Sequence, residues 1–201
     1  MAPQVETDRD PQELAADLAA LATIDWSAVW AGPPGDYSTI PAWCEQFGWT
    51  LDEIGPANDL AVSISTGRDL NLNPRNPYTA ATAFSRADIS CVQAKAETTE
   101  ENPILFGLAD QWWPQYLDAV QAVIGAAEVL TTWDDPAFPD LSFMPGASER
   151  ATFRQPYQLA IWRLKDAIVV LAAFPSDSST RPGRRGTMTL YVTVRPDDAR
   201  Q

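Results

Sequence analysis

Histidine is missing from this sequence of 201 residues. Because histidine is the commonest general base in enzymes and a frequent zinc ligand, its absence excludes Ser-His-Asp and Cys-His catalytic groups and every histidine-based metal site. Cysteine is scarce, with only Cys44 and Cys91. Two thiols cannot build a disulfide framework, and each lies among apolar neighbours, so we expect both to be small buried side chains.

Long apolar runs are missing as well. No run approaches the roughly 18 residues that a membrane-spanning helix needs, and residues 1–9 are acidic where a secretory signal would be basic and then apolar. We therefore expect a cytoplasmic protein. With 45% hydrophobic and 20% charged residues, the chain has the composition of one globular domain. We place this domain at residues 11–196, between flexible tails at 1–10 and 197–201.

Basic residues are few, since 14 Lys and Arg stand against 27 Asp and Glu and leave a net charge of −13. The first 100 residues hold 15 acidic and 5 basic side chains, whereas residues 101–201 hold 12 and 9. This charge argues against nucleic-acid binding, which requires a basic face. It suits a basic protein partner, because complementary fields speed encounter, although solubility alone would also account for it.

Three apolar runs near the C-terminus form the most regular part of the sequence. Gln158–Leu164 and Ala167–Phe174 flank the polar pair Lys165-Asp166, which predicts a β-hairpin. In the third run, Met188–Val194, apolar side chains alternate with threonine and tyrosine. A period of two residues directs one set of side chains inward and the other to solvent, so we predict a further strand with one buried face.

The rest of the chain contains both helical and strand patterns. A capping box at Asp10–Glu13 predicts a helix over residues 11–23. Asn102-Pro103 starts a long helix that Pro114 should kink or divide and Gly125 should end. We further expect a short helix at 40–47, strands at 49–54, 59–65, 68–73 and 87–96, and loops at 131–154 and 175–186. This order predicts an α+β fold, an antiparallel sheet packed on one side by helices.

Carboxylates and tryptophans on the long helix supply candidate binding residues. Two carboxylates eight residues apart on a helix would be separated by roughly 12 Å, farther than the pairs that glycosidases use. Adjacent tryptophans point about 100° apart on a helix, so at least one could lie at the surface and anchor a partner. We predict partner-binding residues here, with a solvated helix face as the alternative: Trp112, Trp113, Asp110 and Asp118.

Asp134, Asp135 and Asp140 could ligate a hard cation such as Mg²⁺ or Ca²⁺ through carboxylate oxygens. Their spacing lacks the regular alternation and the closing glutamate of a calcium loop. We therefore interpret them as turn-forming residues and predict neither a metal site nor a cofactor.

Arg181, Arg184 and Arg185 lie on a loop rich in glycine and proline. Such arginines could hold a phosphate or an acidic partner. Ion pairs with the acidic remainder of the protein are the interpretation that we favour.

Spaced aromatic and glycine positions give the chain a family resemblance. They are Phe47-Gly48-Trp49, Val123-Ile124-Gly125, Trp162-Arg163-Leu164 and the Leu190–Pro196 strand. In this order they resemble a family of uncharacterised actinobacterial proteins of about this length, and more loosely the immunity proteins of bacterial toxin systems and the chaperone-like proteins of secretion systems. The resemblance implies an α+β fold and transfers no catalytic residue.

Two hypotheses of function follow. The first is a non-enzymatic cytoplasmic binding protein, similar to an immunity protein or a chaperone, which docks a basic protein partner through an acidic surface. The alternative is a carboxylate-dependent enzyme or small-ligand-binding protein with its site near Asp134–Asp140. We expect neither a nucleic acid nor a membrane as partner, and a homodimer through the edge of the final strand stays open.

Overall fold

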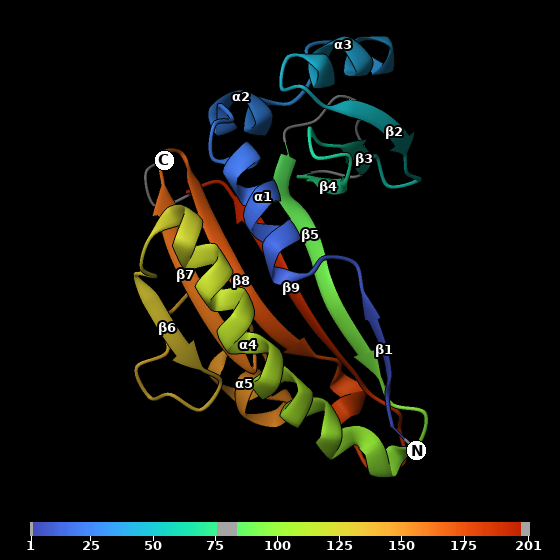
Figure 1. Ribbon diagram of the computed structural model, residues 1–201, viewed down its shortest axis with the longest axis vertical. Coiled ribbons are helices and arrows are strands. Elements are labelled where there is room, and N and C mark those ends of the chain that lie inside the picture. Colours follow the sequence, from blue (N-terminus) through green and yellow to red (C-terminus); the bar gives the residue numbers. More distant parts are fainter. Residues whose placement is uncertain (1, 76–83, 198–201) are drawn as a thin grey trace. The chain divides into compact units, whose positions relative to one another are not determined.

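The computed structural model describes residues 2–75 and 84–197 (Figure 1). Its α-helices are α1 (Pro11–Leu21), α2 (Trp26–Ala31), α3 (Ile40–Glu45), α4 (Asn102–Ile124) and α5 (Ala147–Phe153). Its strands are β1 (Gln4–Thr7), β2 (Thr50–Ile54), β3 (Leu60–Ser63), β4 (Asp69–Pro74), β5 (Phe84–Lys95), β6 (Val129–Thr132), β7 (Gln158–Leu164), β8 (Ala167–Pro175) and β9 (Thr187–Arg195). Short 3₁₀ turns lie at η1 (Tyr37–Thr39), η2 (Thr99–Glu101) and η3 (Asp177–Thr180). The predicted α+β fold is confirmed.

The strands form one antiparallel sheet with the order β2-β3-β4-β5-β9-β8-β7-β6, and β1 pairs separately with β5. The predicted hairpins are present as β3–β4 and β7–β8, and Asp166 in the second turn has a φ of 63°. The final strand β9 lies between β5 and β8. It therefore has no free edge, and the homodimer that we left open at that edge has no basis there.

The N-terminal segment differs from the expected flexible tail, because Gln4–Thr7 form β1 and pair with Thr7↔Val92 and Gln4↔Lys95. The reason is the length of β5. Its first residues pair with β4, and its last residues would leave backbone groups unpaired if β1 did not cover them. The sequence gives little indication of strand β1, because all four of its residues are exposed. The other predicted tail, 197–201, lies almost entirely outside the described residues.

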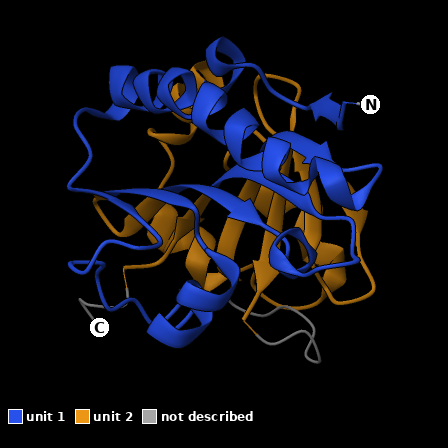
Figure 2. Ribbon diagram, turned by 90° about the horizontal axis from the view of Figure 1, so that it is seen from below, with its two compact units in different colours: residues 1–14, 90–162, 170–192 blue, residues 15–89, 163–169, 193–201 orange. Residues whose placement is uncertain are grey.

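The chain divides into two compact units, coloured in Figure 2. Unit 1 comprises residues 1–14, 90–162 and 170–192, and unit 2 comprises residues 15–89, 163–169 and 193–201. Unit 1 contains 15 acidic and 7 basic residues, and unit 2 contains 12 and 7. Both units are therefore acidic, although along the sequence the imbalance is concentrated in the first 100 residues. The single domain over 11–196 stays a prediction.

In unit 1, one face of α4 enters the core through residues three and four positions apart, as a helix with one buried stripe requires. Its buried apolar side chains are Leu105, Ala109, Trp113, Tyr116 and Val120. Among the strands, β7 and β8 consist mainly of buried side chains, and β9 alternates between buried and half-buried positions up to Val192. The predicted alternation is thus confirmed over most of β9.

Unit 2 is built around aromatic side chains from α2, α3 and the segments beside them. Trp26 stacks on Trp30 with 4.9 Å between ring centroids, and Trp43 stacks on Phe84 at 5.5 Å. The indole of Trp30 donates to the Asp166 carbonyl at 3.0 Å, which gives its buried N–H a partner. Six of the eight tryptophans of the chain are buried, so core packing accounts for most of them.

The predicted loop 131–154 contains more structure than expected, because β6 runs to Thr132 and α5 occupies Ala147–Phe153. No side chain of α5 is fully buried, so the helix has no apolar periodicity for a sequence pattern to reveal. Polar contacts hold it instead. The guanidinium of Arg150 lies 4.0 Å from the Phe138 ring centroid and donates to the Pro145 carbonyl at 3.0 Å.

Pro114 neither ends nor divides α4, which continues to Ile124. Its ring lies on the exposed side of the helix, where solvent can hydrate the Asp110 carbonyl that loses its intrahelical donor. Gly125 ends the helix with a φ of 90°, as predicted. Among the described residues, no helix combines the length and apolar character needed to span a membrane.

We expect Pro114→Ala to raise the free energy of unfolding by about 1–3 kcal/mol, because alanine restores one helical hydrogen bond and removes the proline penalty. Urea denaturation followed by circular dichroism measures the change. Gln115→Ala is the matched control on the same exposed turn and should change stability by less than about 0.5 kcal/mol. A destabilised Pro114→Ala variant would contradict the interpretation.

Candidate functional site

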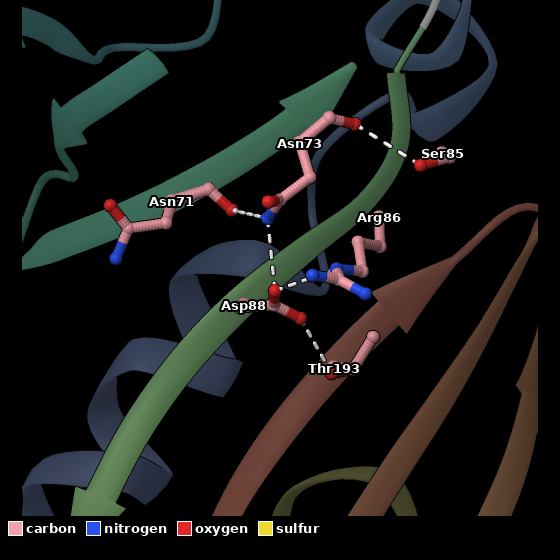
Figure 3. A network of polar contacts seen from close by, with 6 residues as sticks. All are labelled: Asn71, Asn73, Ser85, Arg86, Asp88 and Thr193. Atoms are coloured by element: carbon pink, nitrogen blue, oxygen red, sulfur yellow. Dashed lines mark hydrogen bonds and ion pairs between the residues drawn. The ribbon is translucent and has the colours of Figure 1, made fainter. Parts of the chain in front are cut away.

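A polar cluster in unit 2 crosses strands β4, β5 and β9 around the Asp88 carboxylate (Figure 3). Asp88 Oδ2 pairs with Arg86 Nε at 2.8 Å and accepts from Asn73 Nδ2 at 2.9 Å, and Oδ1 accepts from Thr193 Oγ1 at 2.7 Å. Three donors therefore satisfy both oxygens of one carboxylate. The cluster joins three neighbouring strands, and its role is structural.

The predicted partner-binding carboxylates both lie on the exposed side of α4. Asp110 is engaged by the protein itself: it accepts from Tyr157 Oη at 3.3 Å and from Gln158 Nε2 at 3.1 Å. Burial of the phenol, and next the charge of Asp110, raise the pKa of Tyr157. Asp118 is exposed farther along the helix.

The adjacent tryptophans of α4 have different environments, as their angular separation predicts. Trp113 is only 7% exposed and belongs to the core, so it is not accessible to a partner. Trp112 is half-buried. Of the four predicted residues, Asp110, Trp112 and Asp118 therefore remain predictions of a binding surface, and Trp113 does not.

The aspartates of the 134–140 segment form local turn contacts. Asp134 Oδ1 accepts from Thr132 Oγ1 at 2.7 Å, and Asp135 accepts from the Ala137 N–H at 2.8 Å and from Thr131 Oγ1 at 3.0 Å. These bonds agree with turn-forming residues. In the described part of the chain, no three acidic or cysteine side chains converge as a metal site would require.

The arginines of unit 1 gather at α5 and at the loop after β8. Five of the seven basic residues of unit 1 lie there: Arg150, Arg154, Arg181, Arg184 and Arg185. Within the described residues, none of the five has a carboxylate within the 4.0 Å of an ion pair. The ion pairs that we predicted for Arg181, Arg184 and Arg185 are therefore not formed there. Aromatic rings provide contacts instead, with Arg181 lying 4.9 Å from the Phe153 centroid.

The buried side chain of Asn102 fixes this loop to the start of α4. Its Nδ2 donates to the Arg184 carbonyl at 2.8 Å and to the Ser178 carbonyl at 3.4 Å, and its Oδ1 accepts from the Gly186 N–H at 2.9 Å. Position 186 must be glycine, because a Cβ there would lie 2.4 Å from Ser179 Cα. One amide thus closes the loop onto the helix.

A pocket of about 530 Å³ in unit 1 lies between the start of α4, the end of α5 and η3. No carboxylate lines it. At its wall, the guanidinium of Arg154 lies 5.4 Å from the Phe106 ring centroid and 5.3 Å from that of Trp133. The lining residues are Asn102, Pro103, Phe106, Trp133, Ala151, Thr152, Arg154, Ser179 and Thr180.

Unit 2 carries an acidic surface where α3 packs against β2 and β2 turns into β3. Four carboxylates form this surface, which we call the acidic edge: Glu45, Asp52, Glu53 and Asp59. In the described residues, no basic side chain lies within 4.0 Å of any of them. Beside them, Tyr37 and Ile54 are 42% and 37% exposed.

No family model, curated protein or solved structure matches this chain. The geometry of the acidic edge and of the pocket is therefore the basis for the function of the protein. The sequence showed the acidic excess of the first 100 residues but did not single out the acidic edge, since it predicted the partner-binding residues on α4. It did not indicate the pocket, whose residues come from four separate segments of the chain.

Neither cysteine has the environment of a nucleophile, since both are fully buried. Burial, and next the charge of Asp52, raise the pKa of Cys44 from 9.0 to about 11. The folded state thus favours the protonated thiol. This contribution to stability is present below the thiol pKa of the unfolded chain and is lost as the pH rises through about 11.

In a Cys91→Ala variant, which leaves Cys44 as the single thiol, we expect native protein at pH 8 to react with a disulfide reagent about 100-fold more slowly than denatured protein. The factor follows from the smaller thiolate fraction, and burial adds to it. Absorbance of the released thiolate measures both rates, and circular dichroism confirms that the variant is folded. Equal reaction rates in native and denatured protein would contradict the conclusion that Cys44 is buried with a raised pKa.

Proposed function

We propose that this protein is a non-enzymatic binding protein, similar in role to an immunity protein or a secretion chaperone, that docks an extended basic segment of a protein partner along the acidic edge. The observation that carries the proposal is the position of these carboxylates. Asp52 and Glu53 lie on β2, the terminal strand in the sheet order, and Glu45 and Asp59 lie before and after it. None of the four has a cationic partner within 4.0 Å among the described residues.

The backbone of β2 supports this mode of binding. β2 pairs with β3 on one side, and the strand order places no described strand on its other side. Four of its five residues are exposed. An extended segment can add to such an edge through main-chain hydrogen bonds, which supply affinity without requiring a particular sequence.

Charge supplies the preference for a basic segment. A lysine or arginine about 4 Å from one carboxylate near a protein surface gains roughly 4 kcal/mol of Coulomb energy before desolvation and screening reduce it. Four carboxylates on one edge also steer a basic partner during encounter, an effect that salt weakens. The net charge of −13 adds a long-range field of the same sign.

Apolar anchors lie next to these charges. Tyr37 and Ile54 are among the most exposed large apolar side chains of the protein. The Tyr37 hydroxyl donates to the side chain of Asn58 in the turn that follows β2, which holds the ring beside the edge. A side chain of the partner packed on this ring would provide the apolar contact that charge alone does not.

The alternative is a carboxylate-dependent enzyme or small-ligand-binding protein with its site near Asp134–Asp140, and the geometry of these carboxylates does not support it. Asp134 and Asp135 accept hydrogen bonds from neighbouring turn residues, and none of the carboxylates of the segment lines the pocket.

The test uses a fluorescent peptide of about seven residues that alternates lysine and valine, with a glutamate-valine peptide as the probe of opposite charge. We expect the double variant Glu45→Lys/Glu53→Lys to weaken binding of the lysine peptide about 10-fold or more, because it reverses two of the four charges. Anisotropy gives the affinity at low and high salt, and backbone amide chemical shifts locate the bound peptide.

Glu6→Lys/Asp140→Lys is the matched control, since it makes the same change in net charge at exposed positions of unit 1. Retained binding in the control supports a local site. Equal loss in both double variants, or chemical shift changes remote from β2, would reject the acidic edge as the docking surface.

A further inference from the structure

We propose that the pocket of unit 1 binds a small organic anion, a carboxylate or phosphate attached to an apolar body, and that Arg154 is the residue that pairs with its charge. This site lies wholly within unit 1 and shares no residue with the acidic edge of unit 2. The proposal is therefore independent of the partner-docking function.

The guanidinium of Arg154 is held in place while its N–H groups remain available. Its carbon lies over two rings, 5.4 Å from the centroid of Phe106 and 5.3 Å from that of Trp133. These cation–π contacts restrain the guanidinium and leave its N–H groups available, and a guanidinium can match a carboxylate or phosphate in two parallel hydrogen bonds. Within the described residues, these N–H groups have no hydrogen bond and no carboxylate in ion-pair range.

The backbone at Arg154 also points to a specific arrangement. Arg154 ends α5 in the left-handed conformation with a φ of 55°, which is uncommon for a residue with a long side chain. This conformation terminates the helix and starts the chain segment that leads to β7. The backbone of Arg154 is thus specified, and two cation–π contacts restrain the guanidinium of this exposed residue. Pairing with an anion therefore costs less conformational entropy than it would for an unrestrained arginine.

The rest of the lining suits an organic anion better than a cation or a purely apolar ligand. The hydroxyl groups of Thr152 and Thr180 already donate to the Ser148 and Asp177 carbonyls, so the pairing with an anion rests on Arg154. Pro103, Phe106 and Ala151 offer apolar surface to the body of the ligand. No lining residue is acidic. A volume of about 530 Å³ is within the range of small-molecule sites and exceeds what an inorganic anion would fill.

The electrostatic setting adds to this preference. Arg181, next to the lining residue Thr180, lies over the ring of Phe153, and it also lacks a carboxylate within 4.0 Å in the described residues. The protein as a whole carries −13. Asp110 and Asp134 act electrostatically on Tyr157 together with Arg154, but they lie outside ion-pair range of this arginine. Repulsion between the arginines is thus not removed by an ion pair, and a bound anion would relieve it.

The experiment uses phenyl phosphate and benzoate as the two organic anions, inorganic phosphate as the anion without an apolar body, and benzyl alcohol as the neutral body. The side-chain Nε–Hε resonance of Arg154, assigned by its loss in the Arg154→Asn variant, reports binding directly in a titration. We expect one or both organic anions to shift it saturably with a Kd of about 1 mM or tighter, and the preferred one identifies the anionic group.

Arg154→Asn removes the cation and keeps a residue that tolerates the left-handed conformation. We expect it to weaken the preferred anion about 10-fold or more, as measured by ligand-observed NMR. Arg154→Lys keeps the positive charge but lacks the planar guanidinium, so its affinity for the anion should lie between those of the wild type and Arg154→Asn. Lys95→Gln is the matched control, because it removes one exposed positive charge of unit 1 outside the pocket and should leave binding unchanged.

Several results would overturn the proposal. If benzyl alcohol bound as tightly as the anions, the pocket would select apolar ligands without regard to charge. If inorganic phosphate bound as tightly as phenyl phosphate, the apolar body of the ligand would contribute nothing to binding. Equal affinity in the wild type and in Arg154→Asn would remove Arg154 from the site. Binding of a glutamate-rich peptide but of no small anion would replace the small ligand by a protein partner.

Discussion

The side-chain amide of Asn102 makes the interaction on which the pocket of unit 1 depends. Its three hydrogen bonds close the loop after β8 onto the first turn of α4, and both ends of that loop are thereby fixed. Because position 186 is glycine, its backbone can lie against Ser179 while its N–H donates to Asn102 Oδ1. Ser179 Oγ, which donates to the Thr187 carbonyl at 2.7 Å, also ties η3 to β9, and Asn102 adds the polar contacts that hold this loop against α4, where the pocket lies.

The distribution of charge gives the two units different capabilities. Both are acidic overall, but in unit 1 most of the basic residues lie in α5 and the loop after β8. The carboxylates of the acidic edge in unit 2 have no basic side chain within 4.0 Å among the described residues. Surface charges that are not neutralised internally raise the local potential and are available to a ligand of opposite sign. The proposed basic partner and the proposed organic anion follow from the same electrostatic argument, applied to surfaces of opposite sign.

Both proposals describe the protein as a recognition module, with one binding surface in each unit. The acidic edge combines main-chain hydrogen-bonding groups with charge and two exposed anchors, as surfaces for extended segments do. The pocket combines one arginine, restrained by two aromatic rings, with apolar surface, as small-molecule sites do. The cysteines are buried thiols, and the Asp88 carboxylate is fully engaged by its neighbours, so both contribute to stability.

Local patterns in the sequence determined the α+β class, the 11–23 helix with its capping box, the hairpins and most of the buried face of β9, because periodicity and turn residues act over a few neighbours. They also showed the acidic excess and excluded histidine chemistry. Only the tertiary structure decided that Gln4–Thr7 pair with β5, that Trp113 is buried while Trp112 is partly exposed, and that β9 has no free edge. It also brought Arg154, Phe106 and Trp133 together. These features arise from contacts between residues far apart in the chain, and no local period encodes them.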